Sequence, residues 1–281
     1  MATRTLKMHL PANPAARTAA RCVWALLGAQ VVVRANAEPC AGATGLALTP
    51  TLYAQGWAAY QNVTCIPDHA FCPYDAHNAC AGGTAFAGDV ILADLQQLQS
   101  VGVAAFAFFA GRLQLTGSFP ALVKLGEAAF FNASSPDSVV ELKDLPQLQS
   151  VGKSAFHTFA GRVQLTGSFP ALVRLGDAAC YKASNPASVV ELKDLPQLQS
   201  IGMLAFAVFV GRVQLTGSFP ALVEVGSNAF SSASNPASVV ELKDLPQLHS
   251  VGKHAFAYFV GRVQLTGSFP ALVEVGSGAF A

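Results

Sequence analysis

Charged residues are scarce in this chain: they make up 12% of its 281 residues, with 17 basic and 16 acidic side chains and a net charge of +1. The charges form no run of one sign, so the electrostatic footprint of a protein that binds nucleic acid or an anionic membrane is missing. Apolar residues, at 52%, are too abundant for a disordered chain. These proportions indicate a protein that buries an unusually large share of its residues.

Long apolar runs are missing too. The run "CVWALLGAQVVV" at 22–33 has twelve residues, and a membrane-spanning helix needs about 20. It lies in a leader, residues 1–37, that has five basic residues and no acid. This pattern is typical of a secretory signal peptide cleaved after Ala37, with an organelle transit peptide as the alternative. We therefore expect a secreted or cell-surface chain without a transmembrane segment, and the triplets that begin at Asn62 and Asn132 are candidate glycosylation sites.

Cysteine is almost confined to one region. Apart from one in the leader and Cys180, the cysteines are Cys40, Cys65, Cys72 and Cys80. Four thiols close behind a signal sequence predict two disulfide bonds in a small N-terminal cap, residues 38–89, and three pairings are open. A zinc site is the alternative because His69 and His77 lie between these cysteines, but no Cys-x-x-Cys spacing supports it.

Catalytic motifs are also missing. The sequence has no Gly-x-Ser-x-Gly elbow, no phosphate-binding glycine loop and no His-Glu-x-x-His helix. His157, His249 and His254 occupy three different repeat positions, which is typical of surface variation. The recurring acids are Asp94, Asp144, Asp194 and Asp244. One acid per 50 residues predicts turn capping and not a calcium site, so we expect no enzyme, no cofactor and no metal.

Repetition is what the chain has in abundance. The stretch "ELKDLPQLQSVGKSAF" at Glu141 returns with small changes at Glu191 and Glu241, a period of 50 residues that divides into units of 23 and 27. The eight units, the last one truncated, start at Val90, Leu113, Val140, Val163, Val190, Val213, Val240 and Val263. Such a unit is too short to enclose a core, so we expect a solenoid in which each coil rests on the next over residues 90–281.

Each skeleton position suggests a structural role. The V-x-L segment alternates apolar and polar residues like a half-buried strand. Glycine recurs where a tight turn or a positive φ angle is expected, at Gly102, Gly126, Gly152, Gly176, Gly202, Gly226, Gly252 and Gly276. A phenylalanine column is expected to stack inside the coils: Phe106, Phe130, Phe156, Phe206, Phe230, Phe256 and Phe280. Cys180 takes the phenylalanine place in one coil, which predicts a buried apolar role.

The stretches "LPQLQSVGKSAF" and "FPALVRLGDAAC" resemble the BspA-type leucine-rich repeat, with its L-x-x-I/V-G-x-x-A-F core, over Val90 to Ala281. The resemblance implies a curved solenoid with a parallel sheet on its concave side, turns and short helices on its convex side, and extracellular roles in adhesion or ligand binding. The alternating unit lengths and the Gly-Ser-Phe-Pro step depart from the family pattern. They leave room for a relative such as the receptor L-domain.

The outward strand positions form the one surface with regular chemistry, a predicted polar face nearly 35 Å long. Its candidate ligand-binding residues are Glu141, Lys143, Gln164, Thr166, Glu191, Lys193, Gln214, Thr216, Glu241 and Lys243. Two functions remain open: recognition of an extracellular protein or glycan through this sheet, or a structural wall or matrix role. The last coil carries no polar cap, so we expect either that the chain is a fragment or that this coil contacts a partner or a second copy, and the second hypothesis includes such self-association.

Overall fold

The computed structural model describes residues 46–71 and 88–281. The predicted signal peptide, residues 1–37, lies outside these ranges, as do Cys40, Cys72 and Cys80. Those expectations therefore stay predictions. The described residues belong to one compact unit, 37–281.

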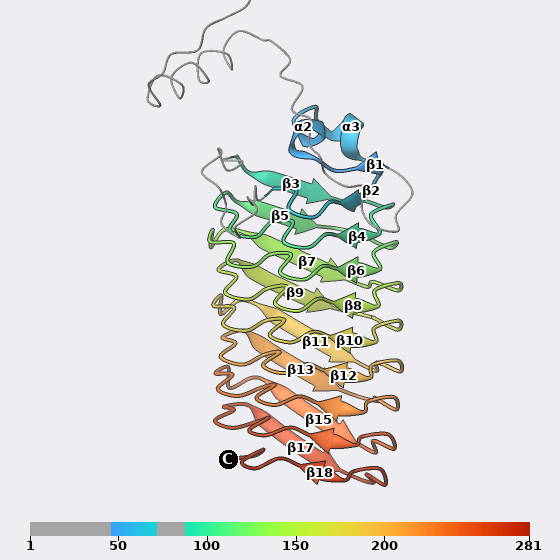
Figure 1. Cartoon of the computed structure of the whole chain (residues 1–281), viewed down its shortest axis with the longest axis vertical. Coiled ribbons are helices and arrows are strands. Elements are labelled where there is room, and N and C mark those ends of the chain that lie inside the picture. Colours follow the sequence, from blue (N-terminus) through green and yellow to red (C-terminus); the bar gives the residue numbers. More distant parts are fainter. Residues whose placement is uncertain (1–45, 72–87) are drawn as a thin grey trace, which may run out of the picture. The chain divides into compact units, whose positions relative to one another are not determined.

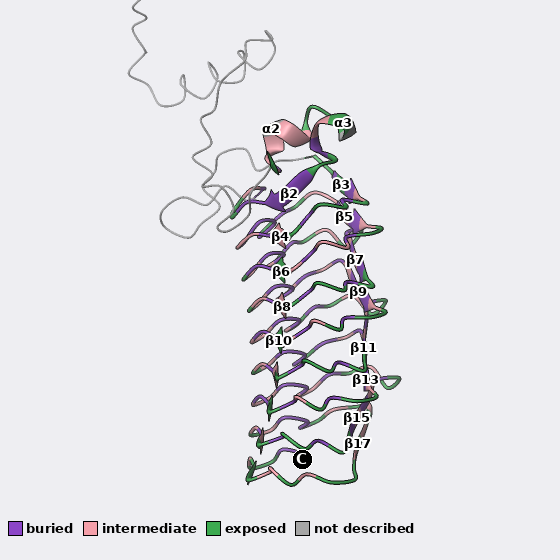
Figure 2. Ribbon diagram, turned by 90° about the vertical axis from the view of Figure 1, so that its right-hand side faces the viewer, coloured by how far each residue is buried: buried purple, intermediate pink, exposed green. Residues whose placement is uncertain are grey.

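The eight predicted coils are present, and each begins with a strand of one parallel sheet (Figure 1). These strands are β3 (Val90–Ala93), β5 (Leu113–Thr116), β7 (Val139–Lys143), β9 (Arg162–Thr166), β11 (Val189–Lys193), β13 (Arg212–Thr216), β15 (Val239–Lys243) and β17 (Arg262–Thr266). They follow one another in chain order across the sheet, so the fold is a parallel β-solenoid. Along the column the strands stack nearly straight (Figure 2), and the sheet does not have the concave curvature expected from the resemblance.

A second parallel sheet of ten strands runs beside the first. It contains β1 (Leu46–Ala47) and β2 (Val63–Ile66), followed by two-residue strands: β4 (Ser100–Val101), β6 (Lys124–Leu125), β8 (Ser150–Val151), β10 (Arg174–Leu175), β12 (Ser200–Ile201), β14 (Glu224–Val225), β16 (Ser250–Val251) and β18 (Glu274–Val275). The short convex helices predicted for the coils are wrong, because residues 88–281 contain no helix.

The backbone bonds after each short strand explain why no helix forms. The N–H groups of Ala104, Phe106 and Phe108 donate to carbonyls of the next coil, at 2.8, 2.7 and 2.7 Å. Ala104 and Phe108 have positive φ angles of 50° and 56°. Every second backbone N–H group in this segment therefore points along the stack toward the next coil. In a helix, the same N–H group would bond to the carbonyl four residues earlier in the chain. The neighbouring coil satisfies these donors, as buried backbone requires.

The eight glycines that recur in the repeat are not required by a positive φ angle, which the sequence suggested. None of the eight has a positive φ angle. A Cβ atom built on Gly176 lies 2.5 Å from the backbone nitrogen of Lys153 and 2.6 Å from the carbonyl carbon of Gly152. Glycine is required there because adjacent coils approach too closely for any side chain.

The phenylalanine column is confirmed as an internal ladder. Neighbouring rings stack nearly parallel, with centroids 5.0 Å apart for Phe130 and Phe156 and 5.1 Å apart for Phe230 and Phe256. Cys180 is buried in the one gap, as predicted. The ladder also continues beyond the repeats, because Phe71 stacks on Phe106 at 4.9 Å.

Two short helices precede the first coil, α2 (Pro50–Tyr53) and α3 (Trp57–Tyr60). The hydroxyl of Tyr53 accepts a hydrogen bond from the N–H of Ile91 at 2.9 Å, and the hydroxyl of Tyr60 donates to the carbonyl of Ile91 at 3.3 Å. These tyrosines therefore cover the free edge of β3, the role expected of a cap. Cys65 in β2 is disulfide-bonded. The predicted pairing of the cap cysteines stays open, because Cys40, Cys72 and Cys80 lie outside the described residues, and Cys180 is free.

Candidate recognition surface

The strand face consists of the outward side chains of the eight-stranded sheet. In each central strand the Val and Leu positions are buried and the residues between them are partly or fully exposed. This places all ten predicted ligand-binding residues on the strand face, where the lysines are the most exposed. Period-two alternation predicts this placement.

From β7 to β17, strands with an outward Glu and Lys alternate with strands with an outward Gln and Thr, but the register shifts, so these pairs do not form straight rows across the strand face. Across each 23-residue step the strands pair in register, so Glu191 lies beside Gln214 and Lys193 beside Thr216. Across each 27-residue step the pairing moves by two residues, and Gln164 lies beside Val189. Rows across the sheet therefore mix residue types. One such row continues from Glu191 and Gln214 to Val239 and Arg262.

Three arginines outside the predicted set of binding residues also line the strand face. Arg162, Arg212 and Arg262 are the first residues of β9, β13 and β17. Extending the strand alternation back by two residues finds them. With Lys143, Lys193 and Lys243 they outnumber the acids on this face, which are Glu141, Glu191 and Glu241.

Ion pairs neutralise part of this charge. Arg212 bonds Glu191 at 2.7 Å, and Arg262 lies 3.3 Å from Glu241. The Nε atom of Arg162 is buried and has no hydrogen-bond partner among the described residues. Lys143, Lys193 and Lys243 form no ion pair within the described part of the chain. The strand face therefore carries unneutralised positive charge along its length.

The recurring aspartates cap turns, as predicted, but across coils. The Oδ1 atom of Asp194 accepts a hydrogen bond from the N–H of Ser218 at 2.9 Å, in the Gly-Ser-Phe-Pro step of the next coil. Asp94, Asp144 and Asp244 make the equivalent bond. Gly217 has a φ angle of +90° and lies against the carboxylate of Asp194. Glycine is therefore required here both by the backbone conformation and by the lack of space for a Cβ atom.

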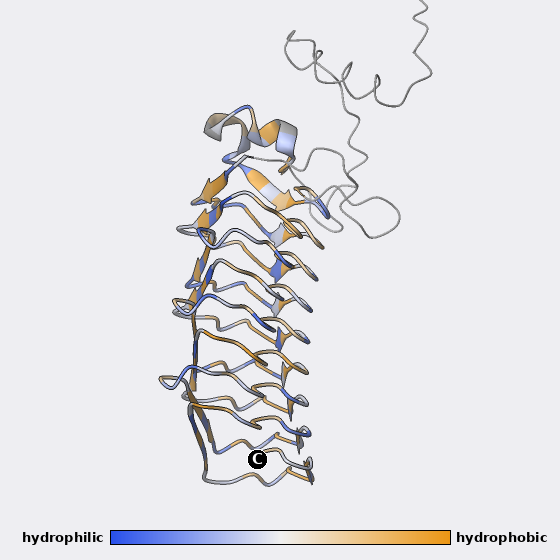
Figure 3. Cartoon of the chain, turned by 90° about the vertical axis from the view of Figure 1, so that its left-hand side faces the viewer, coloured by the Kyte–Doolittle hydropathy of each residue, from blue (hydrophilic) through white to orange (hydrophobic). Residues whose placement is uncertain are grey.

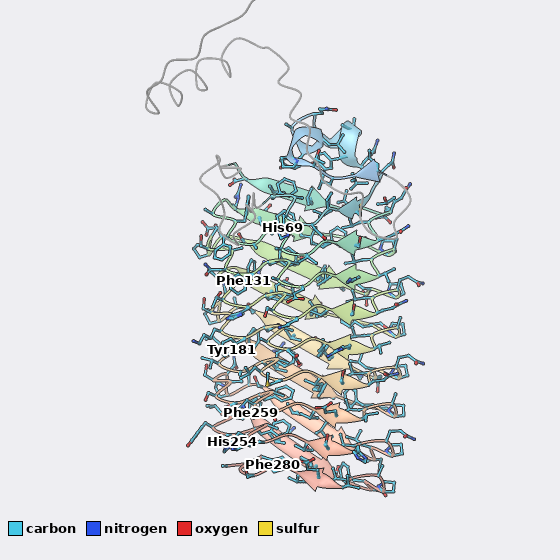
Figure 4. The ribbon with its side chains drawn as sticks, in the orientation of Figure 1. His69, Phe131, Tyr181, His254, Phe259 and Phe280 are labelled. Carbon is cyan, nitrogen blue, oxygen red and sulfur yellow. The ribbon has the colours of Figure 1, made fainter. Side chains whose placement is uncertain are left out.

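His157 is more than surface variation, which was the role predicted for it. Its ring packs edge-on between Phe131 and Tyr181, with both centroid distances at 4.9 Å. Partial burial, and then the charge of Lys182, lower its pKa. Figure 4 shows Phe131 and Tyr181 along one edge of the stacked coils. These three rings link coils at a corner away from the strand face, so they do not join the candidate site.

The other predicted sites are placed as follows. Asn62 and Asn132 are exposed, and their glycosylation stays a prediction. In the last two coils, Phe256, Tyr258, Phe259, Val263, Leu265 and Phe280 line an open depression of about 460 Å³. Within residues 46–71 and 88–281, no group of three metal-ligating side chains occurs. No helix in these ranges is long and apolar enough to cross a membrane.

Comparisons with known proteins give one similarity. No protein-family model matches the chain, and no curated protein matches it. A solved structure, a leucine-rich cell surface protein from Faecalibacterium prausnitzii A2-165, is similar over 62% of this chain and 44% of that one, with 13% sequence identity and a TM-score of 0.42. The match thus spans less than half of that protein. The parallel β-solenoid is established by the strand pairing of this chain itself.

Proposed function

We propose that this chain is a secreted or cell-surface recognition module that binds an extracellular protein or glycan through the strand face and catalyses no reaction. The unneutralised lysines carry the proposal: Lys143, Lys193 and Lys243 recur every 50 residues on a stiff scaffold. The disulfide at Cys65 supports an oxidising compartment. The protein similar in structure is itself described as a cell surface protein.

The charge excess favours an extended, acidic ligand. Weak contacts repeated along one chain add up when the ligand spans several coils. An acidic polysaccharide or an acidic protein segment fits a face on which basic residues recur and glutamates are partly paired with arginines. Charge complementarity of this kind raises the rate of association and makes binding sensitive to salt.

An array of glycans and matrix proteins, probed with the purified chain, tests the proposal. We expect binding to an acidic component, with affinity lost in the triple variant Lys143→Ala, Lys193→Ala, Lys243→Ala. The matched control is Lys153→Ala, Lys182→Ala, Lys253→Ala, which removes three lysines away from the strand face and is expected to bind normally. Equal loss in both variants, or a blank array, would refute recognition through this face.

A structural role by self-association is the second candidate, because large apolar side chains line an open depression in the last two coils. Tyr258 is 77% exposed and Phe280 49%. Association there is driven by apolar burial, so light scattering should show assembly that grows with concentration and persists in high salt. Phe280→Ser and Tyr258→Ser should reduce that assembly.

A further inference from the structure

The ten-stranded sheet carries a row of outward residues that differs in kind from the strand face. The charge row consists of the first residues of the short strands, in order Ser100, Lys124, Ser150, Arg174, Ser200, Glu224, Ser250 and Glu274. Each pairs directly with the next, without a register shift. The row is therefore in register along the whole stack, and Figure 3 shows hydrophilic residues along this column of short strands.

The sign of charge changes halfway along the row. Lys124 and Arg174 lie toward the cap, and Glu224 and Glu274 lie toward the last coil, with a serine between each two. All four charged residues are exposed, and none forms an ion pair within the described part of the chain. The segments that contain them, "SFPALVKLG", "SFPALVRLG" and "SFPALVEVG", are otherwise almost identical. The charged position varies where the surrounding sequence does not.

The order of charges along the row in one copy is complementary to the order in a second copy that runs in the opposite direction. A two-fold axis opposite Ser200 brings Lys124 beside Glu274 of a second copy and Arg174 beside its Glu224. Serine then meets serine at Ser150 and Ser250, and the small side chains permit close approach. A parallel arrangement would instead oppose like charges, Lys124 to Lys124, which is unfavourable. Charged residues along the row are about 10 Å apart, since neighbouring strands are about 4.8 Å apart.

Valines beside the row supply apolar contact. Each charged residue follows a valine: Val123, Val173, Val223 and Val273. Val223 is 42% exposed and Val273 72%.

Other charges lie near the row, two residues beyond the short strands: Glu127, Lys153, Asp177 and Lys253. The reversed arrangement brings Lys153 near Lys253 of the second copy, at the rim, where water and salt weaken repulsion.

We propose that the charge row is an interface between two copies of this chain, packed side by side in opposite directions around Ser200. The interface is isologous, as in most homodimers. A narrow strip of this kind falls at the low end of specific interface sizes, so the dimer is weak. It is independent of the strand face, which stays open for a ligand in both copies, and of the depression in the last two coils.

Analytical ultracentrifugation of the purified chain tests this interface. At an ionic strength of about 0.01 M, where charges act over about 30 Å, we expect a dimer that forms with rising concentration. At about 1 M the range falls to about 3 Å, and the dissociation constant should rise at least about tenfold. A chain that stays monomeric at low salt, or a dimer that salt leaves unchanged, overturns the proposal.

Charge reversal supplies the sharper test. The acidic variant Lys124→Glu, Arg174→Glu and the basic variant Glu224→Lys, Glu274→Lys should each be monomeric, because every contact in the row becomes repulsive. Mixing the two variants should restore a one-to-one dimer, which also shows that both are folded. The control Lys143→Glu, Lys193→Glu on the strand face has the same net charge as the acidic variant and should dimerise normally. A mixture that stays monomeric, or a control that dissociates, contradicts the proposal.

Discussion

The side-chain oxygen of Ser188 accepts a hydrogen bond from the backbone N–H of Val163 at 3.0 Å, linking two coils. The register shift creates the need for this bond: β11 pairs with β9 only from Gln164 onward, which leaves the N–H of Val163 without a strand partner. Ser188 is completely buried, and the 27-residue unit supplies an equivalent serine in the other long coils, Ser138 and Ser238. The extra residues of the long unit thus satisfy a donor that the shift exposes.

Replacing Ser188 by alanine should destabilise the chain by about 1–3 kcal/mol, because the N–H of Val163 is then buried without a partner. Urea unfolding followed by circular dichroism measures this loss. Ser184→Ala, at an exposed position four residues earlier, should change stability by less than about 0.5 kcal/mol. Equal effects from the two substitutions would mean that the bond adds nothing.

Gly176→Ala should also destabilise the chain, although the φ angle of Gly176 is not positive. The new methyl group meets the backbone of the preceding coil at Gly152 and Lys153. Ala178→Gly is the converse test, because Ala178 has a φ angle of 52°, and glycine there relieves about 1 kcal/mol of backbone strain. We expect opposite shifts in the urea midpoint. Stabilisation by Gly176→Ala would show that the coils can separate at this point.

The phenylalanine ladder should contribute unequally along its length. Phe71 is 2% exposed and stacks on Phe106, whereas Phe280, at the other end, is 49% exposed. Phe71→Ala should therefore cost about 3–5 kcal/mol, and Phe280→Ala much less. Hydrogen exchange should show the loss in Phe71→Ala concentrated in the first coils, since each coil contacts only its neighbours. A uniform loss over all coils contradicts that nearest-neighbour view.

Cys180 makes stability depend on alkaline pH. Burial raises the pKa of its thiol from 9.0 to about 12. The unfolded chain releases this proton above about pH 9 while the folded chain retains it, so the thiol's contribution to the free energy of unfolding declines as pH rises from about 9 toward 12. Urea unfolding at several pH values should show the decline, and Cys180→Ala should reduce it. In the native chain at pH 8, an alkylating reagent should leave Cys180 unmodified.

Most of the fold followed from the sequence. The starts of the eight coils, the stacking of Phe130 on Phe156, the burial of Cys180 and the outward position of Lys193 all follow from periodicity, because identical coils give each repeat position the same surroundings. The expected helices were wrong for a related reason. The turn after each short strand directs its N–H groups to carbonyls of the next coil. The sequence pattern of one coil does not show that these hydrogen bonds run between coils.

The sequence by itself determined that coils stack and which side chains point inward, because alternation within a strand and a fixed period are local properties. Only the tertiary structure decided how one coil is offset from the next. That offset places Gln164 beside Val189 on the strand face, whereas the short strands pair without an offset and keep Lys124 and Glu274 on one straight row. The offset is a pairing of residues more than 20 positions apart, such as Val189 with Gln164, so no short stretch of sequence contains it.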